Sequence, residues 1–173
     1  MGRRFGYGLQ NGRNEVAKIY CAGQEFSNEI INDEENHEIP DFWTECYGKN
    51  WWSPEEPAPG GKGSLRPVQP QKENETTFRY GIGIALDGDT GAFEESSLSA
   101  AGYQIWEEEP QTYVVFKCFG EDGSSISEMW GKFYKEFVPQ MGYEAVDATD
   151  YEVYYENGEP GLFCELWIPV RRK

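Results

Sequence analysis

The alternation of hydrophobic and polar positions is clearest near the end of the chain, at residues 149–170. Two runs rich in β-branched and aromatic residues flank a Gly/Pro-rich segment at 157–161, which predicts two strands joined by a turn. Successive side chains of a strand point to opposite faces. In the second run this rule places Phe163, Glu165 and Trp167 on one face and aliphatic residues on the other. The second strand is therefore expected to present an aromatic face with a carboxylate at its centre.

The first of these two runs shows a similar pattern. Alternation groups Glu152 with Tyr154, so two carboxylates are expected among aromatic side chains on neighbouring strands. By parity we also expect Tyr154, Phe163 and Trp106 to share the face of Glu165, although a large aromatic residue in a strand is more often part of the core. Together these residues predict a candidate binding surface.

The same period of two continues earlier in the chain. It predicts further strands at 15–26, 76–86, 102–109 and 111–120. In the strand at 76–86, Tyr80 belongs to a bulky face, whereas the opposite face carries Arg79 and two glycines. Glycine leaves room for another group to approach the backbone. This strand is thus expected to be packed on one face and open on the other.

Helical spacing appears twice. The run IPDFWTECYGKN carries apolar residues, including Trp43, at intervals of three and four, and a proline suited to a first helical turn. It predicts a short amphipathic helix that ends near Gly48. On such a stripe core packing is the default role of a tryptophan, but Trp43 is kept as a candidate for the binding surface.

The second helix is predicted to begin at Ser125. Ser125 and Glu128 have the spacing of a capping box, and an apolar stripe that includes Trp130 follows them. Pro139 and Gly142 are expected to end this helix, because proline removes a backbone donor and glycine favours helix termini. Trp130, like the tryptophan of the first helix, is expected either in the core or at the binding surface.

Two segments do not fit a regular pattern. Residues 1–14 are expected to be a leader or an edge strand, and the Pro/Gly-rich insertion at 50–75 is expected to form no regular element. The remainder reads strand, helix, strand, strand twice, at 15–109 and 111–170. This order predicts a single α+β domain at 15–173. Its duplicated βαββ units would form one antiparallel sheet, with two helices on one face and a ligand cleft on the other.

Composition narrows the class of partner. Aromatic residues make up 16% of the chain, more than a core needs, and the formal net charge is −16. Such a field repels phosphate backbones and favours cations, so direct nucleic-acid binding is not expected. The four cysteines form no CxxC pair and His37 is the only histidine, so no metal site or cofactor is predicted. No apolar run has membrane-spanning length, and a cytoplasmic protein is expected.

These patterns resemble the GyrI-like family, the effector-binding domain found at the C-terminus of multidrug-sensing bacterial transcription activators. The resemblance lies in IPDFW, RYGIGI, QTYVVFKCFG, MWGKFYKEFVPQMGYE, DYEVY and CELWIPV, from about residue 15 onward. It implies a duplicated βαββ fold with a pocket for lipophilic cations. The family's pocket carboxylate falls on Glu165, its aromatic neighbour on Trp167, and an acidic position in the preceding strand on Glu152. The regulators carry a DNA-binding segment that residues 1–14 could not supply, so this chain is not expected to switch transcription by itself.

A carboxylate in a poorly hydrated aromatic site is expected either to be protonated or to bind a positively charged partner. The faces of the aromatic rings would add cation–π attraction for that partner. The predicted ligand-binding set is Glu165, Trp167, Phe163, Glu152, Tyr154, Trp106, Trp130, Trp43 and Tyr80. In the alternative structural role, Glu165 would pair with Arg79, Arg171 or Arg172.

Three functions stay open. The first is a stand-alone protein that binds or sequesters lipophilic, cationic compounds. The second is a hydrolase of reactive electrophiles that uses Glu165 or Glu152 with Tyr154 as a general base. The third is an acidic inhibitor of a partner protein. A homodimer is kept as a further alternative for the partner. An enzyme is the less favoured class.

Overall fold

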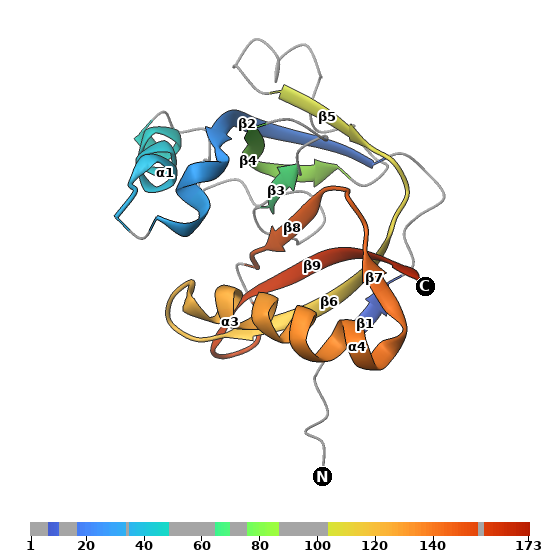
Figure 1. Ribbon diagram of the computed structural model, residues 1–173. Helices are drawn as coiled ribbons and strands as arrows, with labels where there is room; N and C mark the ends of the chain where they lie inside the picture. Colours follow the sequence, from blue (N-terminus) through green and yellow to red (C-terminus); the bar gives the residue numbers. More distant parts are fainter. Residues whose placement is uncertain are drawn as a thin grey trace.

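The computed structural model describes residues 7–10, 17–33, 35–48, 65–69, 76–86, 104–155 and 158–173. Within these ranges the protein is an α+β fold built on one antiparallel sheet, as the sequence predicts (Figure 1). The predicted leader at 1–14 contains strand β1 (Tyr7–Gln10), which pairs with β6 at one end of the sheet. No described helix is long and apolar enough to cross a membrane.

The strands follow the predicted alternation closely. They are β2 (Ala17–Ser27), β3 (Leu65–Gln69), β4 (Thr77–Leu86), β5 (Gln104–Glu108), β6 (Thr112–Phe119), β7 (Tyr143–Ala145), β8 (Asp150–Val153) and β9 (Leu162–Arg172). Their order in the sheet is β1-β6-β9-β8-β3-β4-β2-β5, and β7 also pairs with β9. Every pair is antiparallel. The terminal hairpin therefore lies inside the sheet, with β9 between β6 and β8.

The predicted irregularity of residues 50–75 is wrong for its last part, because residues 65–69 form β3. This strand pairs with β4 on one side and with β8 on the other, so it joins the two halves of the sheet. Proline is normally excluded from central strands, since it cannot donate to the ladder. Pro67 sits opposite Tyr151 of β8, and the ladder to β4 runs through Leu65, Val68 and Gln69. The remainder of 50–75 lies outside the described residues.

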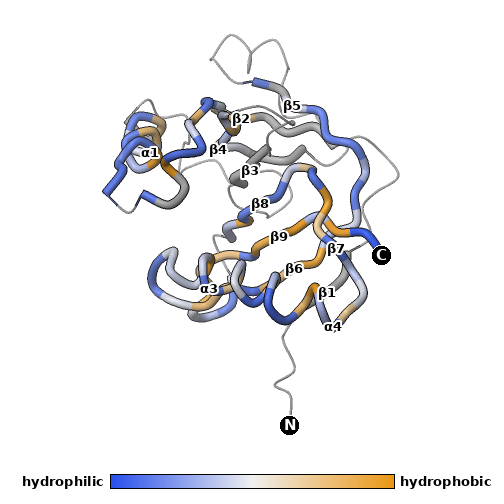
Figure 2. Tube along the Cα trace, viewed as in Figure 1, coloured by the Kyte–Doolittle hydropathy of each residue, from blue (hydrophilic) through white to orange (hydrophobic). Residues whose placement is uncertain are grey.

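One hydrophobic core lies between the sheet and the second helical segment. Alternate residues of β6 and β9, including Val114, Phe116, Leu166 and Ile168, are buried there against Phe133 and others of the helix. The apolar residues of β9 mark this layer in Figure 2. Full burial of such a side chain contributes about 1.5–3 kcal/mol to folding. Turning β9 over would expose several of these side chains at once, so this layer fixes which face of β9 points toward the helix.

A second core lies under α1 (Glu38–Gly48), the helix predicted from IPDFWTECYGKN. Phe42 and Cys46 of α1 pack on Phe26 of β2 and on Phe78, Tyr80 and Ile82 of β4. The bulky face predicted for residues 76–86 is thus confirmed. A short 3-10 helix, η1 (Asn28–Asn32), follows β2 and leads toward α1. The Ser27 hydroxyl caps it by accepting a hydrogen bond from the Glu29 amide.

The second helical segment exists as predicted but begins differently. Helix α3 (Ser124–Lys132) starts after Gly123 without a side-chain cap from Ser125, so the predicted capping box is wrong. Instead the carboxylate of Asp122 accepts a bond from the Ser124 amide, at 3.0 Å. The helix begins one residue earlier than predicted, so Ser125 lies inside its first turn and not at the N-cap position that a capping box requires.

The segment also continues past Pro139, where an end was predicted. A π-helical stretch, η2 (Phe133–Phe137), precedes α4 (Val138–Met141), and Pro139 lies in the first turn of α4. In the wider π turn each backbone hydrogen bond spans five residues, one more than in an α-helix. The segment can therefore accommodate Pro139, which has no backbone N–H to donate. Gly142 then ends the segment with φ 70°, as predicted for a glycine at a helix C-terminus.

The register places both cores on the same face of the sheet. Leu65 pairs with Gly83 of β4 and with Val153 of β8, and Val68 pairs with Tyr80 and Asp150. Opposed residues of an antiparallel pair share a face. The face of Tyr80 under α1 is therefore continuous with the face of Leu166 under α3, which pairs with Glu152. Both helices cover one face, and the duplication of the units stays a prediction.

We predict that Gly23 cannot be replaced by alanine without loss of stability. A Cβ at this position would lie 2.6 Å from Oε1 of Gln104 and 2.7 Å from Cζ2 of Trp106, whose ring is buried. Gly23→Ala should lower the free energy of unfolding in urea by about 1–3 kcal/mol, as overpacking does.

The matched control is Gly131→Ala on α3, where an added Cβ meets nothing within 4 Å. Alanine is the better helix former, so this variant should gain about 0.5–1 kcal/mol. Equal stability changes for the two variants would contradict the close packing at Gly23.

Candidate functional site

Glu165 lies near the middle of β9 on the sheet face opposite α3. Its neighbours in sequence, Cys164 and Leu166, are fully buried in the helix-side core, so alternation turns Glu165 and Trp167 to the other face. The Tyr155 hydroxyl donates to Oε2 of Glu165 at 2.7 Å, and the Trp167 indole N–H donates to the same oxygen at 3.0 Å. Two neutral donors therefore orient this carboxylate without neutralising its charge.

Both donors bind one carboxylate oxygen. Within the described ranges Oε1 of Glu165 receives no hydrogen bond from the protein, and the residue is half-buried. The side chain also forms no ion pair with a described Lys or Arg. A carboxylate that is positioned through one oxygen can interact with a ligand through the other.

Aromatic side chains surround this position. The aromatic cluster consists of Cys21, Trp106, Tyr113, Tyr151, Val153, Tyr155 and Trp167. The ring centroid of Tyr113 lies 5.8 Å from that of Tyr151 and 5.8 Å from that of Trp167. These spacings are typical of favourable ring pairs. The rings thus hold one another in place on the face that carries Glu165.

The aromatic cluster joins the two halves of the sheet. Trp106 and Cys21 come from β5 and β2, whereas Tyr151 and Val153 come from β8. Strands β3 and β4 separate β8 from β2 in the sheet, so a contact across them requires the sheet to curl toward this face. Figure 1 shows the two halves of the sheet inclined toward each other.

Trp106 is held by polar contacts at its rim. Its indole N–H donates to Gln104 Oε1 at 3.0 Å, and the Arg79 guanidinium, 4.2 Å from the Trp106 ring centroid, donates to the same oxygen at 3.3 Å. The Gln104 amide in turn donates to the carbonyl of Gly23 at 3.1 Å. A cation–π contact therefore already occupies one face of Trp106.

Burial governs the tyrosine hydroxyls of the cluster. Desolvation raises the pKa of Tyr155, and the hydrogen bond to Glu165 raises it further. Desolvation also raises the pKa of Tyr113 to about 12. Both hydroxyls are protonated at neutral pH, so Tyr155 is a donor to Glu165 rather than a competing negative charge.

Glu152 and Tyr154 lie on the opposite face of the sheet, which corrects the expectation that they share the face of Glu165. Glu152 pairs with Leu166, whose side chain is buried under the helix, whereas Val153 pairs with Glu165. The Tyr154 hydroxyl donates to Glu152 at 2.9 Å. Alternation within each strand was predicted correctly, but only the register decides which faces of two strands coincide.

Phe163 also packs away from Glu165. Its ring lies 5.6 Å from that of Tyr154, and both rings pack against the core under α3. The register of β6 and β9 shifts between Cys118 and Phe119, opposite this end of β9. A bulge re-aims a side chain, so strand parity fails at Phe163.

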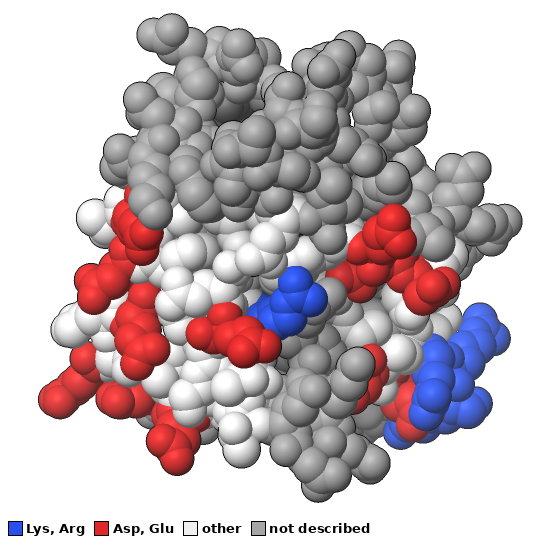
Figure 3. Space-filling model, turned by 90° about the horizontal axis from the view of Figure 1, so that it is seen from above, with Lys and Arg blue, Asp and Glu red and all other residues white. Residues whose placement is uncertain are grey.

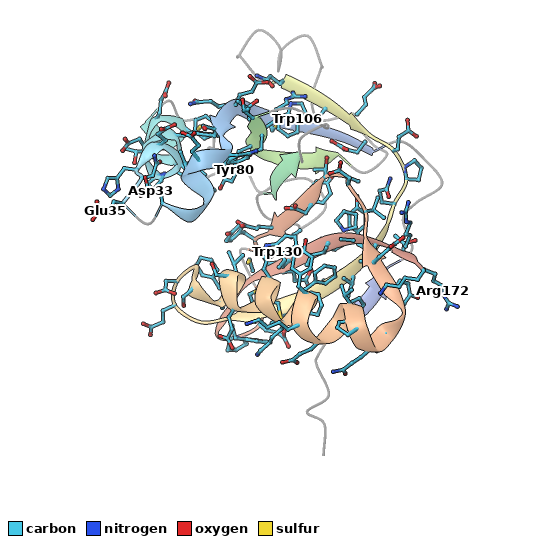
Figure 4. The ribbon with its side chains drawn as sticks, in the orientation of Figure 1. Asp33, Glu35, Tyr80, Trp106, Trp130 and Arg172 are labelled. Carbon is cyan, nitrogen blue, oxygen red and sulfur yellow. The ribbon has the colours of Figure 1, made fainter. Side chains whose placement is uncertain are left out.

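The remaining predicted site residues on helices pack in the two cores. Trp130 lies between α3 and the sheet and packs edge-to-face on Phe133 (Figure 4). The Trp43 indole N–H donates to the Tyr80 hydroxyl at 3.0 Å in the core under α1. Of the predicted set, the structure brings together Glu165, Trp167 and Trp106.

Sequence reasoning missed the tyrosines of the site. Alternation within this strand puts Tyr151, Val153 and Tyr155 on the face opposite Glu152 and Tyr154, but the sequence alone does not match that face to Glu165. The missing signal was the pairing of Val153 with Glu165, which no pattern within one strand contains. No group of three or more described His, Cys, Asp or Glu side chains has the geometry of a metal site.

Asp150 is a further acidic residue with an unusual environment. It begins β8, next to the buried Thr149 and Tyr151. Desolvation, reinforced by the nearby negative charge of Glu152, raises the pKa of Asp150 to about 8. Asp150 is therefore largely protonated at neutral pH, although it belongs to a strongly acidic chain.

A family model described as "Cass2: Integron-associated effector binding protein" matches residues 15–170. No curated protein matches the chain significantly in sequence. The match covers both halves of the sheet, including Glu165 and the aromatic cluster.

Solved structures share the fold. SAV2435 bound to tetraphenylphosphonium has a TM-score of 0.67 and 17% identity, over 95% of this chain and 93% of that one. An integron cassette protein of Vibrio cholerae has a TM-score of 0.63 and 15% identity, over 96% of each chain. The C-terminal domain of EcmrR has a TM-score of 0.60 and 12% identity, over 99% and 100%. The predicted resemblance to GyrI-like effector-binding domains is confirmed.

We predict that Asp150→Asn changes the pH dependence of stability. The folded state holds the Asp150 proton more tightly than the unfolded state does, so this stabilising contribution is complete below pH 4 and is lost as pH rises toward about 8. Relative to the wild type, the variant should therefore gain stability between pH 5 and pH 8, by more than about 1 kcal/mol.

Urea unfolding at the two pH values measures this difference. Glu144→Gln, at a partly exposed residue paired with Arg171, is the control for removing one acidic group. If both variants shift stability equally at pH 5 and pH 8, Asp150 does not carry the proton.

Proposed function

Because the chain belongs to the family of integron-associated effector-binding proteins, we propose that it binds lipophilic, cationic small molecules at Glu165. The observation that carries the proposal is the double hydrogen bond from Tyr155 and Trp167 to a single oxygen of that carboxylate. It leaves the other oxygen for the ligand. The aromatic cluster would then form the wall of the site.

The charge of Glu165 would select the ligand. Neutral donors stabilise a carboxylate but leave its net charge, so a bound cation meets an uncompensated negative group in a half-buried setting. At an effective dielectric constant of 20, two unit charges about 4 Å apart interact by about 4 kcal/mol. A neutral ligand of the same shape lacks this attraction.

The rings would supply most of the contact area. Each ring face adds roughly 0.5–2 kcal/mol of cation–π attraction, and buried apolar area adds about 25 cal/mol per Å² before the cost of association. Tyr113, Tyr151 and Trp167 already pack on one another, so little side-chain ordering is needed on binding. A bulky aromatic cation fits this chemistry better than a small hydrated one.

The similarity to SAV2435 supports the same class of ligand. That protein was solved with tetraphenylphosphonium, a cation whose charge lies within four phenyl groups. The identity of 17% shows a shared fold alone, so the choice of ligand for this chain rests on Glu165 and its surroundings. The match makes tetraphenylphosphonium a suitable first probe.

Hydrolysis of a reactive electrophile is the second candidate. The Tyr155 hydroxyl lies 2.7 Å from the Glu165 carboxylate, and a carboxylate beside a hydroxyl can act as a general base toward water. The pair Glu152 and Tyr154, considered from the sequence, is the weaker choice because it lies on the helix side of the sheet. The same site would serve either function.

We predict that tetraphenylphosphonium quenches the tryptophan fluorescence of this protein and that Glu165→Gln weakens its binding by about ten- to a hundredfold. The variant removes the charge and keeps an amide of similar shape, so the loss reports on electrostatic attraction. A neutral compound of similar shape, triphenylphosphine oxide, should bind both proteins alike.

Glu152→Gln is the matched control, because it makes the same change on the opposite face of the sheet. Its affinity should stay within twofold of the wild type. Binding that is unchanged in Glu165→Gln would refute the proposed site. Catalytic turnover of an epoxide panel, beyond one equivalent per protein and abolished in Glu165→Gln, would instead establish the hydrolase.

A further inference from the structure

A lysine lies directly across from Glu165 but does not bind it. Lys117 of β6 pairs with Glu165 of β9, so both side chains leave the same face of the sheet. The ammonium of Lys117 instead contacts Glu159 Oε2, at 2.7 Å. Both members of this ion pair are about half exposed, at 45% and 50%. The candidate site is thus bordered by the Lys117 ammonium, which is paired with Glu159 and not with Glu165.

Glu159 is held by the turn that leads into β9. Its carbonyl accepts a bond from the Leu162 amide at 3.0 Å, and the Gly161 carbonyl accepts one from the Gly120 amide at 3.0 Å. Gly161 has φ 79°, a conformation that favours glycine. These bonds fix the turn against the end of β6, so Glu159 stands within reach of Lys117.

Lys117 can reach either carboxylate. The Cβ atoms of directly opposed residues on antiparallel strands are about 4.5–5.5 Å apart, which is shorter than an extended lysine side chain. The hydrogen bond to Glu159 raises the pKa of Lys117, and the negative charges of Glu159 and Glu165 act in the same direction. Lys117 therefore stays charged and is attracted by both groups.

We propose that Lys117 is a built-in competitor for Glu165 and that Glu159 holds it away, so that this ion pair sets the affinity of the site for cations. The inference rests on the proposed function, because it concerns ligand binding at the same carboxylate. Lys117 and Glu159 are positioning residues that act through Glu165. Without Glu159, the ammonium would turn to Glu165 and take the place of the ligand's charge.

The same arrangement limits the kind of cation that binds. A ligand with an exposed ammonium would approach Lys117 closely and be repelled. In tetraphenylphosphonium the charge is enclosed by rings, which keep it at a distance from its neighbours. The pair therefore favours bulky single cations over compact polyamines. Acidic side chains are spread over the face of the molecule seen in Figure 3. The overall negative charge attracts both kinds of cation, so it would not by itself distinguish a bulky single cation from a polyamine.

The experiment compares the wild type with Glu159→Gln, Lys117→Gln and the double variant. Tetraphenylphosphonium affinity, measured by calorimetry at low salt, should fall about two- to fivefold in Glu159→Gln, the range typical of an exposed ion pair. In Lys117→Gln the affinity should equal or exceed that of the wild type. The double variant should match Lys117→Gln, because Glu159 has no role once its lysine is gone.

The control pair is Glu128 and Lys132 on α3, whose side chains are 3.1 Å apart and exposed. Glu128→Gln and Lys132→Gln make the same changes in net charge. Their effects on affinity should be small and of the sign that net charge predicts. If Glu159→Gln behaves like Glu128→Gln, or if the double variant binds as weakly as Glu159→Gln, the competition does not occur.

A ligand-free measurement separates this inference from the proposed function. The Trp167 indole N–H donates to Glu165, so its resonance in a ¹H–¹⁵N spectrum should shift when Lys117 moves onto that carboxylate. The shift should appear in Glu159→Gln and disappear in the double variant. This pattern without any cation binding would refute the proposed function and leave the competition standing. An unshifted resonance in Glu159→Gln would overturn the inference itself.

Discussion

The pairing of β8 with β9 is the constraint on which the site depends. Val153 lies opposite Glu165 and Glu152 lies opposite Leu166, so one carboxylate faces the aromatic cluster and the other faces the helix side. A slip of one residue would exchange these faces throughout β8. The hydrophobic core prevents that slip, because Leu166 and Ile168 are almost fully buried under the helical segment. Core packing thus decides which tyrosine reaches Glu165.

The two faces of the sheet have different roles. The face under α1 and α3 holds two aliphatic and aromatic cores, against which two of the four tryptophans predicted for the binding surface, Trp43 and Trp130, are packed. The other face holds the aromatic cluster, in which Trp106 from β5 meets Tyr151 from β8. Strand β3 makes this contact possible by joining the halves into one sheet that curls. The candidate site therefore lies on the face of the sheet that α1 and α3 do not cover.

The elements themselves could be predicted from local pattern. Strand alternation located β8 and β9, and helical spacing located α1 and α3, since each signal lies within one continuous run. The predicted capping box was wrong because the helix begins at Ser124 after Gly123, which places Ser125 inside the first turn. Strand β3 was missed because Pro67 argues against a central strand, and its two partners come from distant parts of the chain.

The sequence by itself determined the class of fold and the family, and it singled out Glu165 and its neighbour Trp167 as candidate site residues. These follow from alternation and motif order, which are properties of single segments. Only the tertiary structure decided that Tyr155 rather than Tyr154 binds Glu165, that Trp106 joins the same cluster, and that Lys117 lies across from it. Register and curl set those contacts, and both depend on how separate segments pack together.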